Sequence, residues 1–422
     1  MKPDARTDLY RVVAARFLSR TGSEAAFFVG VWGKAAFDLS ATATQLALLM
    51  FTMGVASIGG SFMAGAMVDR YGPRRVLAAA EVVFVPAALA VAFASDIVTL
   101  TALVGIWAFV GAPVVTAGAS FAPFLRREDL PLERINAWIE GAGSLSFAVG
   151  PAAGALLVRY ASVDWVFVLD AATSLVAALL VWHVRITIPE RVATTEKRHP
   201  LAEFTRGIKT VYAVRPLRYY VIVGSLAWFA FGAFGSLEPL FFRDVVGTDV
   251  EMLGWINSVF GVGFVVGASL LPHIPRGTFS ARGLAVMVAL VGAGTVLYVG
   301  FPDLRIIAIG AFVWSATIGL MEPLLRTLMH RDAPPGVLGR VMGTVEVHRR
   351  LGELVPLTVA PALATAFGVQ PVMIGGGIIA ALIALFSLGE AGIVDRLVGR
   401  VGADPDDIQG IRTSDEPLSP NP

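Results

Sequence analysis

The chain of 422 residues contains no cysteine and only five histidines. Disulfide bonds, thiolate catalysis, iron–sulfur clusters and cysteine-based zinc sites are therefore excluded. Charged residues are also scarce, at 15%, where a soluble chain carries about a quarter. No G-x-x-x-x-G-K-[ST] loop for a nucleotide phosphate occurs, which excludes ATP hydrolysis as an energy source. We expect no cofactor, no metal and no enzymatic activity.

Hydrophobic side chains, by contrast, make up 56% of the chain, and the mean hydropathy is +0.72. So much apolar surface cannot be hidden from water, so lipid must act as the solvent. The N-terminal run lacks a small-residue cleavage site and is expected to stay as the first helix. The sequence predicts an all-α integral membrane protein with twelve transmembrane helices of about 20 residues or more, near residues 11–37, 42–68, 74–94, 98–124, 135–158, 164–186, 217–242, 252–274, 282–301, 304–328, 341–367 and 370–394.

One substantial polar segment, residues 188–215, separates the sixth run from the seventh and is predicted to be a cytoplasmic linker. It divides the chain into two six-helix bundles, residues 1–187 and 216–395. The remaining tail, residues 396–422, has no apolar period, which predicts disorder. Lysine and arginine are concentrated in the linker and in the loops after the second, fourth, eighth and tenth helices, which places both termini in the cytoplasm. We expect a multi-pass protein of the cell membrane.

An internal repeat supports two related halves. The stretch 46–63 matches 254–270 at an offset of about 207 residues, and Arg134 to Glu140 matches Arg340 to Glu346 at nearly the same offset. Two separate alignments that agree on one offset predict parallel halves, related by an axis along the membrane normal, with a cavity between them.

A charged hinge lies between the second and third apolar runs and reads Gly65-Ala-Met-Val-Asp69-Arg70-Tyr-Gly72-Pro-Arg74-Arg75. Glycine allows two helices to approach closely, and a carboxylate can accept hydrogen bonds from a neighbouring helix N-terminus. The arginines can hold the loop at anionic lipid headgroups. Contacts of this kind, broken and remade, would form a gate; the alternative is a plain cytoplasmic loop. The gating candidates are Gly65, Asp69, Arg70, Gly72, Arg74 and Arg75.

The hinge resembles the loop between helices 2 and 3 of major facilitator superfamily transporters, whose consensus is roughly G-x-x-x-D-[RK]-x-G-[RK]-[RK]. The resemblance spans about residues 10–395 and implies two six-helix halves that alternate in access around a central cavity. It also implies that the hinge latches the outward-facing state. The second half departs from the pattern, because the position that matches Asp69 is near Arg276.

The fifth helix carries a second motif, Gly150-Pro151-Ala-Ala-Gly154, which is similar to the antiporter signature of facilitator exporters. The resemblance implies export by antiport. A seam of small residues that only packs two helices is the alternative. The fourth helix, around Trp107, lacks the arginine that many drug/proton antiporters carry there, so the resemblance leaves the route of the proton open.

Three segments resemble the exporter branch that includes macrolide pumps and the enterobactin exporter. They are Arg16-Phe-Leu-Ser-Arg20-Thr-Gly22-Ser23, the stretch from Arg134 to Gly154, and Phe167-Val-Leu-Asp170-Ala-Ala-Thr-Ser. In that branch an acidic residue often follows the glycine of the first helix, whereas Ser23 follows it here and Glu24 comes next.

Charges inside apolar helices are costly, so each is a candidate site for substrate or proton. Arg20 and Glu24 are four residues apart in the first helix, where they either form a structural ion pair or bind substrate. Asp170, in the sixth helix, either functions in transport, caps a neighbouring helix or pairs with Arg159. Glu238 and Glu322 each precede a proline, which predicts an unwound, hydrated pocket in which a carboxylate exchanges a proton for substrate.

A further set of charges opens the fifth and eleventh helices and is predicted to form a cytoplasmic network between the halves, with residues Arg134, Glu140, Arg340, Glu346, Arg350 and Glu353. Glu81 and Glu140 are expected to pair with the arginines of the hinge.

The sequence thus favours a secondary active transporter that exports a small organic molecule, such as a drug, siderophore or secondary metabolite, by proton antiport. The alternatives are a facilitator or importer of a sugar, amino acid or lysolipid, and a membrane sensor that does not transport. The expected partners are a small-molecule substrate, protons and membrane lipid. We expect a monomer and no binding of nucleic acid.

Overall fold

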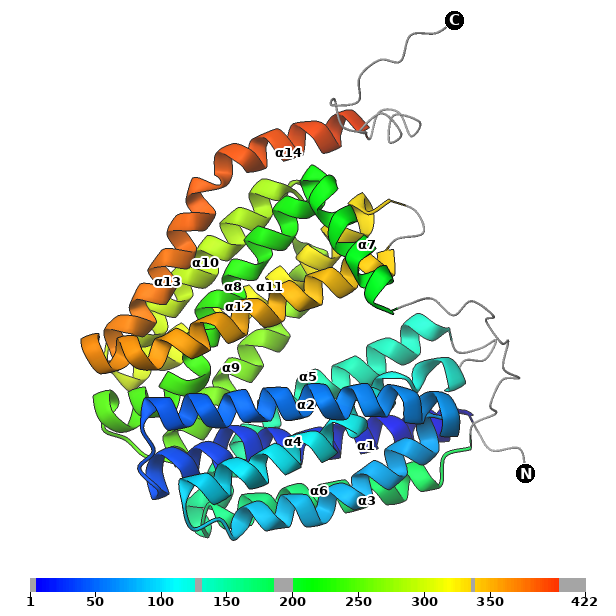
Figure 1. The fold of residues 1–422 in the computed structure, drawn as a ribbon, viewed down its shortest axis with the longest axis vertical. Helices are drawn as coiled ribbons and strands as arrows, with labels where there is room; N and C mark the ends of the chain where they lie inside the picture. Colours follow the sequence, from blue (N-terminus) through cyan, green and yellow to red (C-terminus); the bar gives the residue numbers. More distant parts are fainter. Residues whose placement is uncertain (1–4, 126–130, 186–199, 335–337, 402–422) are drawn as a thin grey trace, which may run out of the picture.

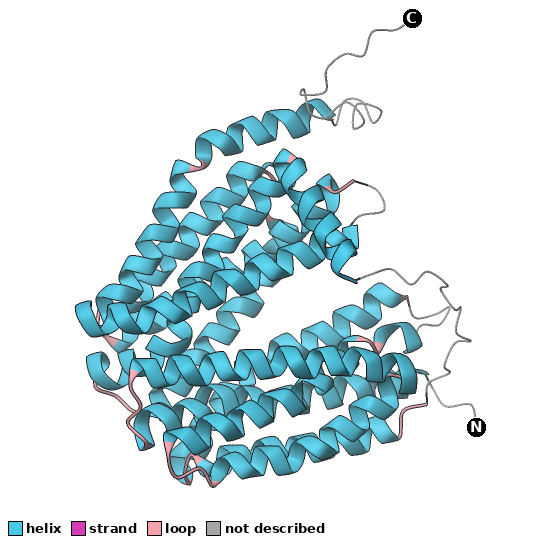
Figure 2. Ribbon diagram, viewed as in Figure 1, coloured by secondary structure: helices cyan, strands magenta, loops and turns pink. Residues whose placement is uncertain are grey.

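The computed structural model describes residues 5–125, 131–185, 200–334 and 338–401. Within these ranges, every regular element is a helix (Figure 2). Two parts of the predicted features, residues 188–199 of the linker and the tail beyond residue 401, lie outside the described residues.

The first bundle is built from the six long helices α1 to α6, whose arrangement Figure 1 shows. Its first helix continues through two π-helical segments, η1 (Ala26–Val31) and η2 (Gly33–Asp38). Turns of this kind are rare and occur frequently at functional sites. The long helices are α1 (Ala5–Ala25), α2 (Ala43–Tyr71), α3 (Pro73–Ala92), α4 (Ile97–Ala119), α5 (Leu132–Tyr160) and α6 (Asp164–Trp182), and a short 3₁₀ turn, η3 (Ala122–Leu125), follows α4.

The second bundle repeats this plan. A short amphipathic helix, α7 (Pro200–Ala213), precedes it, and another, α14 (Leu388–Val401), follows it. Its long helices are α8 (Arg215–Leu240), extended by the π-helical η4 (Phe241–Val246), α9 (Val250–Leu270), α10 (Ala281–Val299), α11 (Leu304–Asp332), α12 (Leu338–Phe367) and α13 (Val369–Phe386), with short 3₁₀ turns η5 (Leu271–His273) and η6 (Arg276–Thr278) between α9 and α10.

Ten of these helices, within the described parts of the chain, are long and apolar enough to cross a membrane. The helices α1 and α12 are not among the ten; α1 carries charged residues along its whole length, and those of α12 lie between Arg340 and Glu353. The last predicted run does not form one helix, because the chain bends at Ser387 between α13 and α14. The helix α14 then extends to Val401, past residue 396, where the sequence predicted a disordered tail.

Local sequence accounts for several helix starts. Thr42 caps α2 through a capping box with Gln45, and the Asp96, Asp249 and Asp303 side chains accept hydrogen bonds from the first backbone N–H groups of α4, α9 and α11. Such caps satisfy donors that a helix cannot pair itself. The starts of α2 and α9, at Ala43 and Val250, differ by the repeat offset of about 207 residues.

The two bundles diverge toward the side on which α6 ends and α8 begins, which we call the linker side (Figure 1). Contacts between the bundles lie in the opposite, far-side half of the molecule. There, the Ser258 hydroxyl of α9 donates to the Ala148 carbonyl of α5 at 2.5 Å, and Arg159 pairs with Glu251 at 3.4 Å. The described structure is therefore closed on the far side and open on the linker side.

The turn between α2 and α3 depends on Gly72, whose φ of 80° and ψ of 156° are accessible essentially to glycine alone. We expect Gly72→Ala to lower the free energy of unfolding by about 1–3 kcal/mol, measured as a lower apparent melting temperature of the purified protein in detergent. The matched control is Gly65→Ala, because a Cβ atom there meets nothing within 4 Å and alanine favours the helix. Equal melting temperatures for Gly72→Ala and wild type would contradict this reading of the turn.

Candidate functional site

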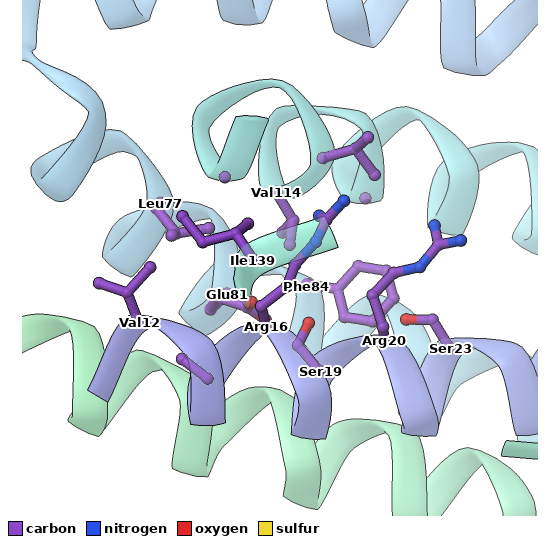
Figure 3. A pocket seen from close by; sticks show the side chains of 14 residues that line it. Val12, Arg16, Ser19, Arg20, Ser23, Leu77, Glu81, Phe84, Val114 and Ile139 are labelled. Carbon is purple, nitrogen blue, oxygen red and sulfur yellow. The ribbon is translucent and has the colours of Figure 1, made fainter. Parts of the chain in front are cut away.

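A polar face of α1 points into the interior of the first bundle. Arg16, Ser19, Arg20 and Ser23 follow one another at helical spacing, and Figure 3 shows their side chains projecting from the same side of the helix. With Glu81 of α3, they line a small cavity of about 60 Å³. A cavity of this size holds a few water molecules but no drug-sized compound.

Arg20 and Glu24 form the ion pair that their spacing allows, with 2.5 Å between Arg20 Nη2 and Glu24 Oε1. The Glu24 side chain is buried, whereas Arg20 is 35% exposed. Glu24 lies where α1 and α5 meet closely, since a Cβ atom on Gly150 would lie 2.6 Å from the Glu24 Cβ.

Asp170 is fully buried at the centre of the first bundle. Its carboxylate accepts one hydrogen bond from the Ser23 hydroxyl of α1 at 3.0 Å and another from the Trp107 indole of α4 at 2.9 Å. The alternative of a pair with Arg159 is wrong, because Arg159 reaches Glu251 of the other bundle instead. Asp170 therefore ties three helices together through neutral donors.

Glu81 lies in the same interior and is only 2% exposed. One of its carboxylate oxygens, Oε2, is buried without a hydrogen-bond partner, as is Nε of Arg16. The expectation that Glu81 pairs with the hinge arginines is wrong, since its neighbours are Ser19 and Arg16 of α1 and Ser174 and Asp170 of α6. The cause is the rotation of α3, which turns Glu81 toward the bundle interior.

Glu238 lies in the second bundle and accepts a hydrogen bond of 2.5 Å from the Tyr298 hydroxyl of α10. Aromatic rings surround this pair: the Trp314 ring centroid is 5.5 Å from that of Tyr298 and 4.6 Å from that of Phe234. The predicted unwinding is wrong, because α8 stays helical through Pro239. The site is a half-buried carboxyl group beside an aromatic cluster.

Glu322 has a different environment. It pairs with Arg326 of its own helix at 2.9 Å, and Arg326 is largely exposed. The helix α11 runs unbroken through Pro323, so the unwound pocket predicted here is also absent from the described chain.

The predicted network between the halves is wrong in its main part. On α12, Arg349 and Arg350 each pair with Glu346 and Glu353, so these ion pairs join residues of a single helix. Arg134 and Glu140 are exposed on α5. The side chain of Arg340 lies outside the described residues. Charges three and four residues apart on one helix meet without help from the other bundle.

The hinge residues lie at the linker-side ends of α2 and α3. Asp69 is exposed and, among the described residues, makes no hydrogen bond or ion pair. Arg70 lies over the Tyr71 ring at 5.2 Å, Arg74 donates to the Val184 carbonyl at 3.0 Å, and Arg75 is exposed. The close helix contact expected at Gly65 is wrong for this conformation, because a Cβ atom there meets nothing within 4 Å.

The motif on α5 packs helices. Added Cβ atoms at Gly150 and Gly154 would lie 2.8 Å from the Thr21 carbonyl and 2.8 Å from the Val29 side chain. The Pro151 carbonyl faces Gly254 of α9, in the other bundle. The motif therefore holds α5 between α1 and α9, and α5 is a helix through which both bundles touch.

Sequence reasoning missed Arg16, Glu81 and Trp107 as parts of one polar site. A signal for Arg16 was present, because Arg16, Arg20 and Glu24 recur at intervals of four residues on one face of α1. No local signal connects Glu81 or Trp107 to this face, since both come from other helices.

Two bundles of membrane-crossing helices, with charged groups buried inside the bundles, define a polytopic membrane transporter. The family model of the Major Facilitator Superfamily matches residues 12–356, and the chain belongs to that family of transporters.

Relatives of known name support the assignment. The multidrug efflux pump Tap of Mycolicibacterium fortuitum is 27% identical over 326 residues, which cover 74% of this chain and 78% of that protein. The MFS-type transporter YfiS of Bacillus subtilis is 21% identical over 369 residues, which cover 84% and 86%.

Solved structures show the same fold. A mutant form of the nucleoside transporter NupG has a TM-score of 0.75 at 11% identity, and the match covers 90% of this chain and 99% of that one. A bacterial homologue of the human lysosomal transporter Spinster, in an inward-facing and unoccupied conformation, has a TM-score of 0.65 at 13% identity and covers 99% and 100%. At sequence identities this low, the similarity to these structures shows the fold alone.

Proposed function

We propose that this protein exports a small organic molecule across the cell membrane by exchange for protons. The observation that carries the proposal is the relation to the efflux pump Tap, together with buried carboxyl groups in a transporter that has no nucleotide-binding loop. With both termini in the cytoplasm, as the positive-inside rule indicates, the linker side faces the cytoplasm and the described conformation is inward-facing.

The second bundle supports a proposal for the substrate class. Glu238 lies beside the rings of Tyr298, Trp314 and Phe234, and such a combination suits an amphipathic molecule with a flat ring and a positive charge. The resemblance to macrolide and enterobactin exporters remains a prediction about the branch of the family.

The direction of transport and its coupling can be tested in everted membrane vesicles that contain the full chain, with an imposed pH gradient, acid inside. A panel of ethidium, tetracycline and erythromycin serves as probes. We expect gradient-dependent uptake of at least one compound, which corresponds to export from cells. Uptake that does not depend on the pH gradient would instead support a facilitator. Uptake that occurs only in right-side-out vesicles would support an importer.

The hinge supplies a separate prediction. Since Asp69 is exposed and unpaired in the described conformation, Asp69→Asn should leave binding of a transported compound nearly unchanged. Its proposed latch acts in the other conformation, where loss of a hydrogen bond to a charged group costs about 1.5–3 kcal/mol. We therefore expect roughly tenfold slower transport, measured as initial uptake rate, with binding followed by ligand fluorescence.

The matched control for Asp69→Asn is Glu133→Gln, which removes an exposed carboxylate from the first turn of α5. This control should transport at the wild-type rate. Weakened binding with normal turnover in Asp69→Asn would contradict a gating role for the hinge.

A further inference from the structure

The buried charges in and beside the cavity of the first bundle do not balance. Arg16 and Arg20 of α1 face three buried acidic residues: Glu24 on the same helix, Glu81 on α3 and Asp170 on α6. The described residues of α4 carry no charge, α2 carries charges only at its exposed linker-side end, and Glu140 of α5 is exposed. The buried cluster is therefore neutral when one carboxyl group holds a proton.

The structure distinguishes the three acids. Glu24 is held by Arg20 in an ion pair. Both carboxylate oxygens of Asp170 accept hydrogen bonds from neutral donors, and Asp170 does not line the cavity. Glu81 does line it, and its Oε2 atom is buried without a partner. Glu81 is therefore the acid with an oxygen free to take up a proton.

Water can reach this carboxyl group. The cavity has about 60 Å³ and a polar lining of two serines and two guanidinium groups, enough room and enough partners for a few water molecules. Arg20, which is 35% exposed, connects this lining to the outside of the bundle. In Figure 3, Ser19 lies between Arg20 and Arg16 along the polar face, and Glu81 lies beside Arg16.

We infer that this cavity is a proton-binding site, in which the Glu81 carboxylate takes up the transported proton and Arg16 is its counter-charge. The step adds one proton to one oxygen of Glu81 and changes no other bond. The inference rests on the proposed proton antiport and assigns it to α3 and α1, rather than to Glu238 or Glu322.

Arg16 links the site to the bundle interface. A Cβ atom on Gly118 of α4 would lie 3.3 Å from its guanidinium, and one on Gly143 of α5 would lie 3.7 Å from it. The far-side half of α5 contacts α9 of the second bundle. When Glu81 is protonated, Arg16 loses one of the buried acids that act on it, and Glu140 on α5 is an acid that remains toward that helix. A change in charge at Glu81 thus alters how α1 packs on α5.

The test measures proton binding directly. Infrared difference spectra of the full-length protein in lipid, taken between about pH 6 and about pH 9, report buried carboxyl groups, because exposed ones stay ionised there. We expect the wild type to lose a protonated-carboxyl band as the pH rises. Glu81→Gln should lack this band, and the control Glu133→Gln should keep it. A wild-type band in Glu81→Gln would overturn the assignment.

The same proteins are then compared in everted vesicles with the panel compound that wild type transports. Glu81→Gln should lose at least nine-tenths of gradient-driven uptake but keep exchange of labelled for unlabelled compound, which needs no proton cycle. If Glu81→Gln lacks the band but keeps full gradient-driven uptake, Glu81 does not couple transport to protons. That result would contradict the inference. If wild-type uptake does not depend on the pH gradient but the band is still lost in Glu81→Gln, proton antiport is refuted. The assignment of Glu81 as a proton-binding site then still stands.

Glu81→Asp provides a second variant should Glu81→Gln fail to insert. It keeps the carboxyl group but shortens its reach toward Arg16. We expect the band to persist at a shifted frequency, with gradient-driven uptake reduced several-fold. If Glu81→Asp shows the band at the wild-type frequency and full gradient-driven uptake, the proposed role of Glu81 is contradicted.

Discussion

Gly261→Ile is expected to drive the transporter out of the conformation described and to stop transport almost completely. Gly261 of α9 packs on the backbone of α5, where an added Cβ atom would clash with the Phe147 carbonyl and lie 2.5 Å from the Ala148 Cα. Backbone cannot move aside as a flexible side chain can, and overpacking a close contact costs about 1–3 kcal/mol. Because 1.4 kcal/mol changes an equilibrium about tenfold, the far-side-closed population should fall by roughly 5- to 100-fold.

The absence of cysteine makes this measurement direct. Spin labels on Ala137→Cys of α5 and Leu270→Cys of α9, both exposed near the linker side, report the distance between the bundles by electron–electron double resonance. We expect shorter distances in Gly261→Ile, as the linker side closes. Gly141→Ile is the matched control, because nothing lies within 4 Å of a Cβ atom there. Unchanged distances in Gly261→Ile would show that the α5–α9 contact does not hold the far side closed.

Arg243→Gln is expected to open the far side by a different route. Arg243 of η4 donates from Nη1 to the Ala36 carbonyl at 2.6 Å and to the Ala41 carbonyl at 3.2 Å, both in the first bundle. Its own neighbour Asp244 holds the guanidinium in place through two further hydrogen bonds. Hydrogen bonds from a charged donor contribute about 1.5–3 kcal/mol to stability. The population of the far-side-closed state should therefore fall by roughly 10- to 100-fold.

The readout is the labelling of a single cysteine, Val29→Cys, by a membrane-impermeant maleimide. Val29 is fully buried and packs against Gly254 of the other bundle, so it reacts only when the far side opens. Labelling should be at least tenfold faster in Arg243→Gln. Arg305→Gln, an exposed arginine at the start of α11, serves as control and should leave the rate unchanged. Similar rates in both variants would argue against a clamp at Arg243.

Features within one helix were predictable. The pair of Arg20 with Glu24 follows from a spacing of four residues, because the helix itself brings such side chains together. The charges of α12 meet for the same reason, although the sequence suggested partners in the other half. The exposed position of the hinge at the ends of α2 and α3 also follows from local sequence.

Contacts between helices were not predictable. Trp107 and Asp170 are 63 positions apart, and their hydrogen bond depends on how α4 and α6 are rotated toward each other. Glu81 was assigned to the hinge arginines, yet the rotation of α3 places it beside Arg16. In lipid, both faces of an apolar helix look alike in sequence, so hydrophobic periodicity does not reveal which face turns inward.

A helical membrane protein of two related halves with a charged hinge could be predicted from the sequence, because the lengths of the apolar runs, the spacing of the arginines and the internal repeat are read directly along the chain. Which acids are buried together, which bundle surfaces touch and which side is closed became visible in the three-dimensional arrangement alone. Those properties depend on the rotation and tilt of packed helices, which arise from close contacts at residues such as Gly150, Gly254 and Gly261. The cavity beside Glu81 exists for that reason, since four separate helices, α1, α3, α4 and α5, contribute its walls.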